Sequence, residues 1–76
     1  MKIFLGSQLN FYHPQKKNWL DVEIDRPTPL SGILEGLDIP LGEVYLVVLN
    51  GEVADISKTI VSQKDEVKLY PPVGGG

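Results

Sequence analysis

The 76-residue chain contains no cysteine, only one histidine and no long apolar run. The lack of cysteine excludes a disulfide scaffold, a thiolate zinc site and a cysteine nucleophile. Because His13 is the only imidazole, a multi-histidine metal site is excluded as well. No apolar run approaches the roughly 20 residues of a membrane helix, and Met1–Gln8 does not look like a signal peptide. We therefore expect a soluble, cytoplasmic domain that has no membrane partner.

Basic residues are also scarce, with seven lysines and arginines against ten acidic residues and a net charge of −3. Nucleic-acid phosphates attract a basic patch, so no nucleic-acid partner is expected. The length suits one domain, and a hydrophobic share of 42% suffices for one compact core. Nothing in so short a chain pairs a nucleophile with its base. We expect a protein that is not itself an enzyme.

The first third of the chain predicts two paired strands. Met1–Leu5 is apolar and is typical of a first strand, with a ragged continuation toward Phe11–Tyr12. His13–Asn18 is a polar loop, which makes His13 a loop residue. Trp19–Asp25 alternates between apolar and acidic residues, so it predicts a half-buried strand in a hairpin with the first. Its core-facing side chains are Leu20, Val22 and Ile24.

A short helix is predicted next. Thr28 is suited to its N-cap and Pro29 to its first position. A stripe with i, i+3, i+4, i+7 spacing must pack on a sheet; its members are Leu30, Ile33, Leu34 and Leu37. Gly32 suggests that the helix lies close to the sheet, and Gly36 is suited to the C-terminal cap.

The second half predicts further strands. Val44–Leu49 is nearly all apolar, as in an inner strand, and Asn50–Gly51 is a hairpin signal leading into a short strand, Glu52–Ala54. Ile56–Ser62 has no clean period and is predicted to be irregular. After a turn at Gln63–Asp65, the last strand alternates again. It covers Glu66–Tyr70 and stops at two prolines.

These elements predict an α+β domain, in which a mixed sheet of four to five strands carries one helix on one face. Since the helix returns the chain to the same sheet, the first and last strands are expected to pair in parallel. Residues 1–70 form the domain and residues 71–76 a projecting tail. Alternation places Phe4, Trp19 and Tyr70 on the face away from the helix. There they either form a partner-binding patch or pack on one another.

The strand order and the tail together resemble the ubiquitin-like β-grasp fold, and within it the ThiS/MoaD family of sulfur carriers. The resemblance is strongest to the small subunits of molybdopterin synthases. It rests on Val47–Glu52, Asp65–Val67 and Pro71–Gly76. There are two departures: Lys64 replaces a glycine common in the family's acidic turn, and Gly74 replaces a common alanine.

The resemblance implies that the Gly76 carboxylate is adenylated by a ubiquitin-activating-like enzyme, which uses ATP and magnesium. Sulfide from a donor system then replaces AMP to give a thiocarboxylate. The resemblance further implies that the tail inserts into the large catalytic subunit of molybdopterin synthase and gives this sulfur to a cyclic pyranopterin in molybdenum or tungsten cofactor synthesis. The carrier itself would bind no metal and no cofactor. Gly75 and Gly76 have no side chains, so the end of the tail would fit narrow channels in both partners. The partner-binding residues expected in the tail are Gly75, Gly74, Val73, Pro72 and Pro71, with the prolines stiffening its base. Phe4 and Tyr70, placed by alternation, complete the expected partner-binding residues.

Three alternatives stay open. The sulfur could serve thiamin thiazole or tRNA thiolation. The chain could be a ubiquitin-like modifier joined to lysines through Gly76. It could also be a β-grasp interaction module whose tail does no chemistry. Asp65–Glu66 is either a solvated turn, which we favour, or a contact with a basic patch on the activating enzyme.

Overall fold

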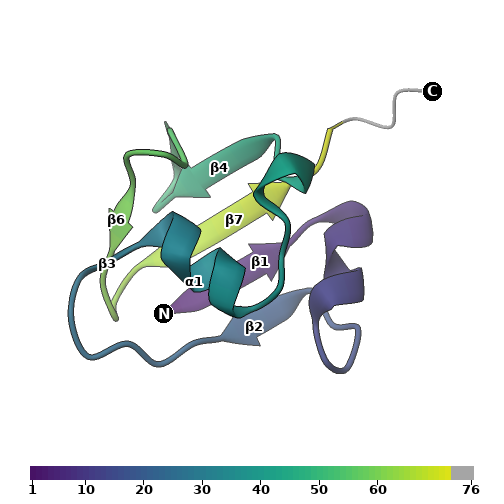
Figure 1. Ribbon diagram of the computed structural model, residues 1–76, viewed down its shortest axis with the longest axis horizontal. Helices are drawn as coiled ribbons and strands as arrows, with labels where there is room; N and C mark the ends of the chain where they lie inside the picture. Colours follow the sequence, from purple (N-terminus) through teal and green to yellow (C-terminus); the bar gives the residue numbers. More distant parts are fainter. Residues whose placement is uncertain (73–76) are drawn as a thin grey trace.

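A mixed five-stranded sheet forms one layer of the computed structural model, which describes residues 1–72 (Figure 1). The strand order across the sheet is β2–β1–β7–β4–β5. Its strands are β1 (Lys2–Leu5), β2 (Trp19–Asp21), β4 (Leu46–Leu49), β5 (Glu52–Ala54) and β7 (Glu66–Tyr70). β1 and β7 pair in parallel, whereas the other neighbours are antiparallel. The predicted parallel pairing of first and last strands is confirmed.

Helix α1 (Leu30–Gly36) crosses one face of this sheet (Figure 1). Its predicted apolar stripe is confirmed, because Leu30, Ile33 and Leu34 are buried and Leu37 is half-buried. Each fully buried aliphatic side chain stabilises the fold by about 1.5–3 kcal/mol. The sheet meets the stripe with side chains that include Ile3, Leu5, Val47, Val67 and Leu69.

Shorter elements complete the chain. There are two 3₁₀ helices within residues 1–72: η1 (Ser7–Tyr12) follows β1, and η2 (Leu41–Glu43) precedes β4. A separate two-stranded sheet pairs β3 (Thr28–Pro29) with β6 (Ile60–Val61). One helix on one face of a mixed five-stranded sheet is the α+β arrangement of the ubiquitin-like β-grasp fold, so the predicted fold class is confirmed.

The second strand is shorter than Trp19–Asp25, although its alternation is correct. Leu20, Val22 and Ile24 are all half-buried against the core. The ladder with β1 ends where Val22 N–H donates to the Met1 carbonyl (2.9 Å). Ile24 N–H donates instead to Gln63 Oε1 (2.7 Å), so a side chain replaces the ladder beyond Val22.

The ragged continuation of the first strand toward Phe11–Tyr12 is wrong. β1 ends at Leu5, and η1 begins at Ser7, whose left-handed backbone (φ 46°) cannot continue the strand. Leu9 is fully buried at the centre of η1. Burial of this one side chain, rather than a strand period, therefore organises the segment.

Both helix ends differ from the prediction. Thr28 and Pro29 form β3, and Thr28 Oγ1 donates to the Arg26 carbonyl (2.8 Å) rather than capping α1. Gly36 is the last helical residue, and the left-handed residue that ends the helix is Asp38 (φ 60°). Gly32 does not approach the sheet either, since a Cβ there would meet nothing within 4 Å.

The second half follows the prediction except at two points. β4 begins at Leu46, two residues later than expected, and Ile56–Ser62 contains β6 instead of being irregular. The hairpin is confirmed, with Asn50 at φ 49° and Gly51 at φ 89° joining β4 to β5.

Asn50 also ties this hairpin to the start of β7. Its Nδ2 donates to Asp65 Oδ1 (2.9 Å), and its Oδ1 accepts the Glu66 N–H (2.9 Å). Asp65 Oδ2 accepts the Ser62 N–H (2.7 Å). The Asn50 hydrogen bond is the main reason that the pKa of Asp65 lies below its usual range.

Replacing Asp65 by Asn should lower the free energy of unfolding by about 1–2 kcal/mol at neutral pH, since the negative charge is lost and one of the two acceptor oxygens becomes an N–H donor. A lowered folded-state pKa stabilises the protein above the unfolded-state pKa, and this stabilisation is lost as pH falls through the folded value. The difference between wild type and Asp65→Asn should therefore shrink in acid. Urea unfolding across pH 2.5–7 measures it, with Glu52→Gln as the control for a lost exposed charge. A pH-independent difference would contradict this role.

Candidate functional site at the end of the last strand

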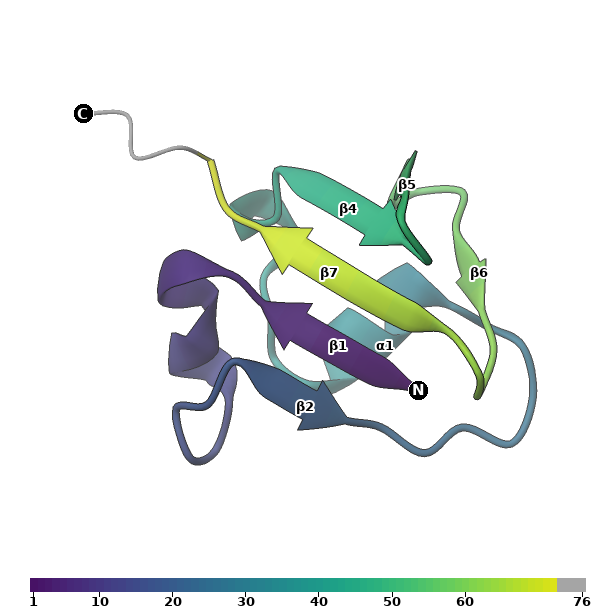
Figure 2. The same ribbon diagram turned by 180° about the vertical axis from the view of Figure 1, so that it is seen from behind.

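The predicted tail leaves the sheet at the end of β7, between two neighbouring segments (Figure 2). On the β1 side, Gly6 N–H donates to the Leu69 carbonyl (2.9 Å). On the β4 side, Tyr45 N–H donates to the Tyr70 carbonyl (2.8 Å). Pro71 is buried and Pro72 is exposed. We call Leu69–Pro72 the stem. It is held from both sides at Leu69 and Tyr70, the two residues before its prolines.

Gly6 allows β1 to end against the stem. A Cβ at this position would lie 2.9 Å from the Leu69 carbonyl oxygen and 2.8 Å from Tyr70 Cδ1. The backbone of Gly6 is extended (φ −75°, ψ 150°), which any residue adopts. Close approach, and not conformational freedom, therefore requires glycine here.

Gly6→Ala should lower the free energy of unfolding by about 1–3 kcal/mol, because the backbone carbonyl and the ring must move apart. The loss should appear in urea denaturation, together with shifted NMR signals of the Tyr70 ring. Gly32→Ala is the matched control: it lies in open space within α1 and should stabilise by up to about 1 kcal/mol. Equal effects of the two substitutions would contradict the steric explanation.

Three aromatic rings form a row beside the stem on the face away from α1. Phe4 and Trp19 are cross-strand partners with ring centroids 5.1 Å apart, and Phe4 and Tyr70 are 5.9 Å apart. These distances are typical of tilted aromatic pairs. The interpretation that the rings pack on one another is confirmed. Trp19 nevertheless keeps 44% of its surface exposed, so the row also presents apolar surface to solvent.

The sequence analysis missed two exposed aromatic side chains near the same end of the sheet. Tyr45 is 74% exposed, and its backbone contacts the stem. Phe11, in η1, is 63% exposed and lies 4.4 Å from Lys16 Nζ. Tyr45 stands in the apolar run before β4, where it reads as a strand residue, and Phe11 was assigned to the extension of the first strand. No sequence period marks either as surface-exposed.

A hydrogen bond joins the two 3₁₀ helices at this end of the molecule. Tyr12 Oη, in η1, donates to Glu43 Oε2, in η2 (2.5 Å). This hydrogen bond is the main cause of the raised pKa of Tyr12. The segments that follow β1 and precede β4 are therefore tied to each other where the stem leaves.

The structure thus brings four predicted site residues together: Phe4, Tyr70, Pro71 and Pro72. The other predicted positions, Val73, Gly74, Gly75 and Gly76, lie outside the described residues. His13 is the predicted loop residue, but it is buried, and its Nδ1 accepts the Gln15 N–H (2.9 Å).

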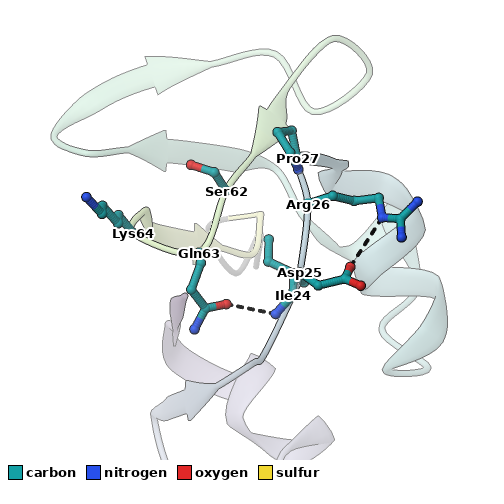
Figure 3. A pocket seen from close by; sticks show the side chains of 7 residues that line it. All are labelled: Ile24, Asp25, Arg26, Pro27, Ser62, Gln63 and Lys64. Carbon is teal, nitrogen blue, oxygen red and sulfur yellow. Dashed lines mark hydrogen bonds and ion pairs between the residues drawn. The ribbon is translucent and has the colours of Figure 1, made fainter.

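A pocket of about 300 Å³ lies elsewhere, between the connection from β2 to β3 and the turn before β7 (Figure 3). Gln63 Oε1 closes one side by accepting the Ile24 N–H, and Arg26 Nε lies 3.3 Å from Asp25 Oδ1 (Figure 3). The pocket sits at the start of β7, whereas the stem leaves from its end. It is therefore separate from the tail site.

Within residues 1–72, no group of three or more His, Cys, Asp or Glu side chains is arranged to hold a metal ion. None of the helices in this part of the chain has the length and apolar character to cross a membrane.

A family model described as Mut7-C ubiquitin matches residues 3–74. The match runs from β1 to beyond β7, and it takes in all of α1 and the stem prolines. A search of curated proteins found no match to the chain.

Proposed function

Since the chain belongs to the Mut7-C ubiquitin family, we propose that it is a ubiquitin-like sulfur carrier that acts through the carboxylate of Gly76. The observation that carries the proposal is the stem. Pro71–Gly76 follows directly on β7, a strand held between β1 and β4. Its last two carbonyls are fixed by Gly6 and Tyr45. The strand that precedes the proposed reactive residues is therefore fixed on both sides.

The proposed chemistry has two steps. The carboxylate first attacks the α-phosphorus of ATP in the activating enzyme, which releases pyrophosphate and leaves an acyl adenylate. Hydrogen sulfide ion then attacks the acyl carbon and loses its proton to solvent. The bond from that carbon to the phosphate oxygen breaks, AMP leaves, and a thiocarboxylate remains. ATP and magnesium belong to the partner enzyme, and the carrier supplies only the acyl group.

The aromatic row supports a role for this end of the sheet in partner binding. Phe4 and Tyr70 adjoin the stem, and Trp19 extends the row to the edge of the sheet. Exposed aromatic surface is enriched in protein interfaces. We assign this row to contacts with the adenylating enzyme and with the large subunit of a molybdopterin synthase, which would use the sulfur in molybdenum or tungsten cofactor synthesis in the cytoplasm.

The proposal is tested by measuring the intact mass of the protein after it has been incubated with a ubiquitin-activating-like enzyme, ATP, magnesium and sulfide. Replacement of one carboxylate oxygen by sulfur is the expected result. Adenylation without sulfur uptake would instead support a protein modifier, and lysine conjugates in a lysate would then identify it. No change with several such enzymes would favour an interaction module without tail chemistry.

The acceptor is tested separately with the thiocarboxylated protein. Incubation with the large subunit of a molybdopterin synthase and a cyclic pyranopterin should return the carboxylate form and yield a pterin product that contains the transferred sulfur. Sulfur transfer to a thiazole synthase or to tRNA, with none to the pterin, would reassign the acceptor while leaving the carrier role in place.

A further inference from the structure

The outer edge of β2 has backbone groups that no other strand uses within residues 1–72. β2 is the terminal strand of the sheet order. Asn18 and Val22 bond to β1, because the Asn18 carbonyl accepts the Leu5 N–H (2.6 Å) and Val22 N–H donates to Met1 (2.9 Å). Inward and outward bonding alternate along an antiparallel strand. The backbone groups of Trp19, Asp21 and Glu23 therefore point away from the sheet.

A hollow of about 230 Å³ lies beside the same edge, on the face away from α1. It is lined by Lys2, Trp19, Asp21 and Glu66. Lys2 pairs with Asp21 on one side and with Glu66 on the other. Two carboxylates against one ammonium group give this lining a net negative charge, and the Trp19 ring adds an apolar wall. A cationic side chain with an aliphatic stem suits both features.

Charge along the edge distinguishes between two kinds of occupant. Asp21, Glu23 and Asp25 are all exposed on consecutive alternate positions. Among residues 1–72 the recorded ion pair is Asp25 with Arg26, so the Asp21 and Glu66 carboxylates are not neutralised by a salt bridge there. Pairing with a second copy through this edge would bring like charges together, which is destabilising across strands. A basic segment would meet opposite charges.

We propose that the β2 edge binds an extended basic segment of another protein, which adds a strand beside β2 and places one arginine or lysine side chain in the hollow. Side chains alternate along the added strand. Its cationic residues would lie over the hollow and the carboxylates, and its intervening apolar residues would lie beside half-buried Leu20 and Val22. This site shares Trp19 with the aromatic row, but it does not require the proposed chemistry at Gly76.

The probe is an acetylated and amidated peptide, Val-Arg-Val-Arg-Val, titrated into the ¹⁵N-labelled full chain. The expected shifts centre on the amides of Trp19, Asp21 and Glu23 and on the Trp19 indole N–H. These three amides should also gain protection from hydrogen exchange. Binding should weaken with salt, and the matched peptide Val-Glu-Val-Glu-Val should not bind.

A double variant, Asp21→Asn with Glu66→Gln, should weaken binding of the arginine peptide by about tenfold or more, since two charge-assisted contacts are removed. Glu35→Gln with Glu52→Gln removes the same charge from exposed positions elsewhere and should leave affinity unchanged. Thermal unfolding of both variants shows that each is folded. Equal weakening by both, shifts centred on β5 or the tail, concentration-dependent self-association through β2, or no binding would each overturn the proposal. Loss of sulfur transfer would not affect it.

Discussion

Removal of Gly75 and Gly76 is expected to abolish adenylate and thiocarboxylate formation and to leave the unfolding transition unchanged. The proposed reactive carboxylate would then end on Gly74, two residues short of its position. The described core side chains run from Met1 to Leu69, and glycine has no side chain to bury. Intact mass after incubation with the activating enzyme measures the first effect, and thermal unfolding measures the second.

Two single variants sharpen this test. Gly75→Val keeps the terminal carboxylate and adds a branched side chain, so it should reduce thiocarboxylate yield severely if the partner's channel is narrow. Glu35→Gln changes an exposed residue of α1 and leaves the tail intact, so product should form at the wild-type yield. A lower unfolding temperature after deletion of Gly75 and Gly76 would contradict the separation of scaffold from reactive tail.

Leu69→Ala is expected to lower the free energy of unfolding by about 2–5 kcal/mol. Leu69 is fully buried in β7, between its partners Leu5 and Val47. A small domain has a total stability of only about 5–15 kcal/mol, so the variant should be partly unfolded under mild denaturant. The effect should be greater than that of any exposed substitution on the same sheet.

Urea denaturation followed by circular dichroism measures this loss. Val53→Ala is the matched control, because Val53 lies in β5 and is 74% exposed; its effect should stay within about 0.5 kcal/mol. Leu69→Met conserves volume and should cost less than about 1.5 kcal/mol. If Leu69→Ala and Val53→Ala were equally mild, the centre of the core would not lie where the structure places it.

The sequence predicts the elements whose pattern is local. Glu66–Tyr70 and Glu52–Ala54 have the predicted bounds, because alternation and the flanking turn or prolines mark both ends. The helical stripe is likewise marked by the spacing of Leu30, Ile33 and Leu34. These signals depend on neighbouring residues only, so no knowledge of the fold is needed to interpret them.

The sequence does not predict elements whose formation or bounds depend on contacts between residues far apart in the chain. β6 forms because Ile60 and Val61 pair with Thr28 and Pro29. A strand of two residues is too short to have a recognisable alternation, so the sequence does not predict this pairing. The end of β2 depends on Gln63, whose side chain takes the Ile24 N–H. The start of α1 was predicted one residue too early for the same reason: Thr28 and Pro29 pair with β6 as β3, and the helix begins at Leu30.

The candidate site likewise contains features that a local pattern predicts and features that depend on distant contacts. Alternation correctly placed Phe4, Trp19 and Tyr70 on one face. Tyr45 is held beside the stem by its backbone hydrogen bond to Tyr70. No periodic pattern in the sequence predicts such a contact. The need for glycine at position 6 could not be predicted from the sequence either, because it depends on the close approach of β7 from the other end of the chain.

The parallel pairing of β1 with β7 has a consequence for how the protein folds. It joins residue 2 to residue 66 and residue 5 to residue 69, so the centre of the sheet closes only after a very long loop has closed. Such non-local pairing slows folding, and the β1–β2 hairpin alone is at best marginally stable. During synthesis the sheet therefore cannot form until β7 has left the ribosome. The strand that bears the proposed sulfur-carrying tail is also the one that completes the fold, so a chain truncated before β7 would present an incomplete sheet to cellular proteases.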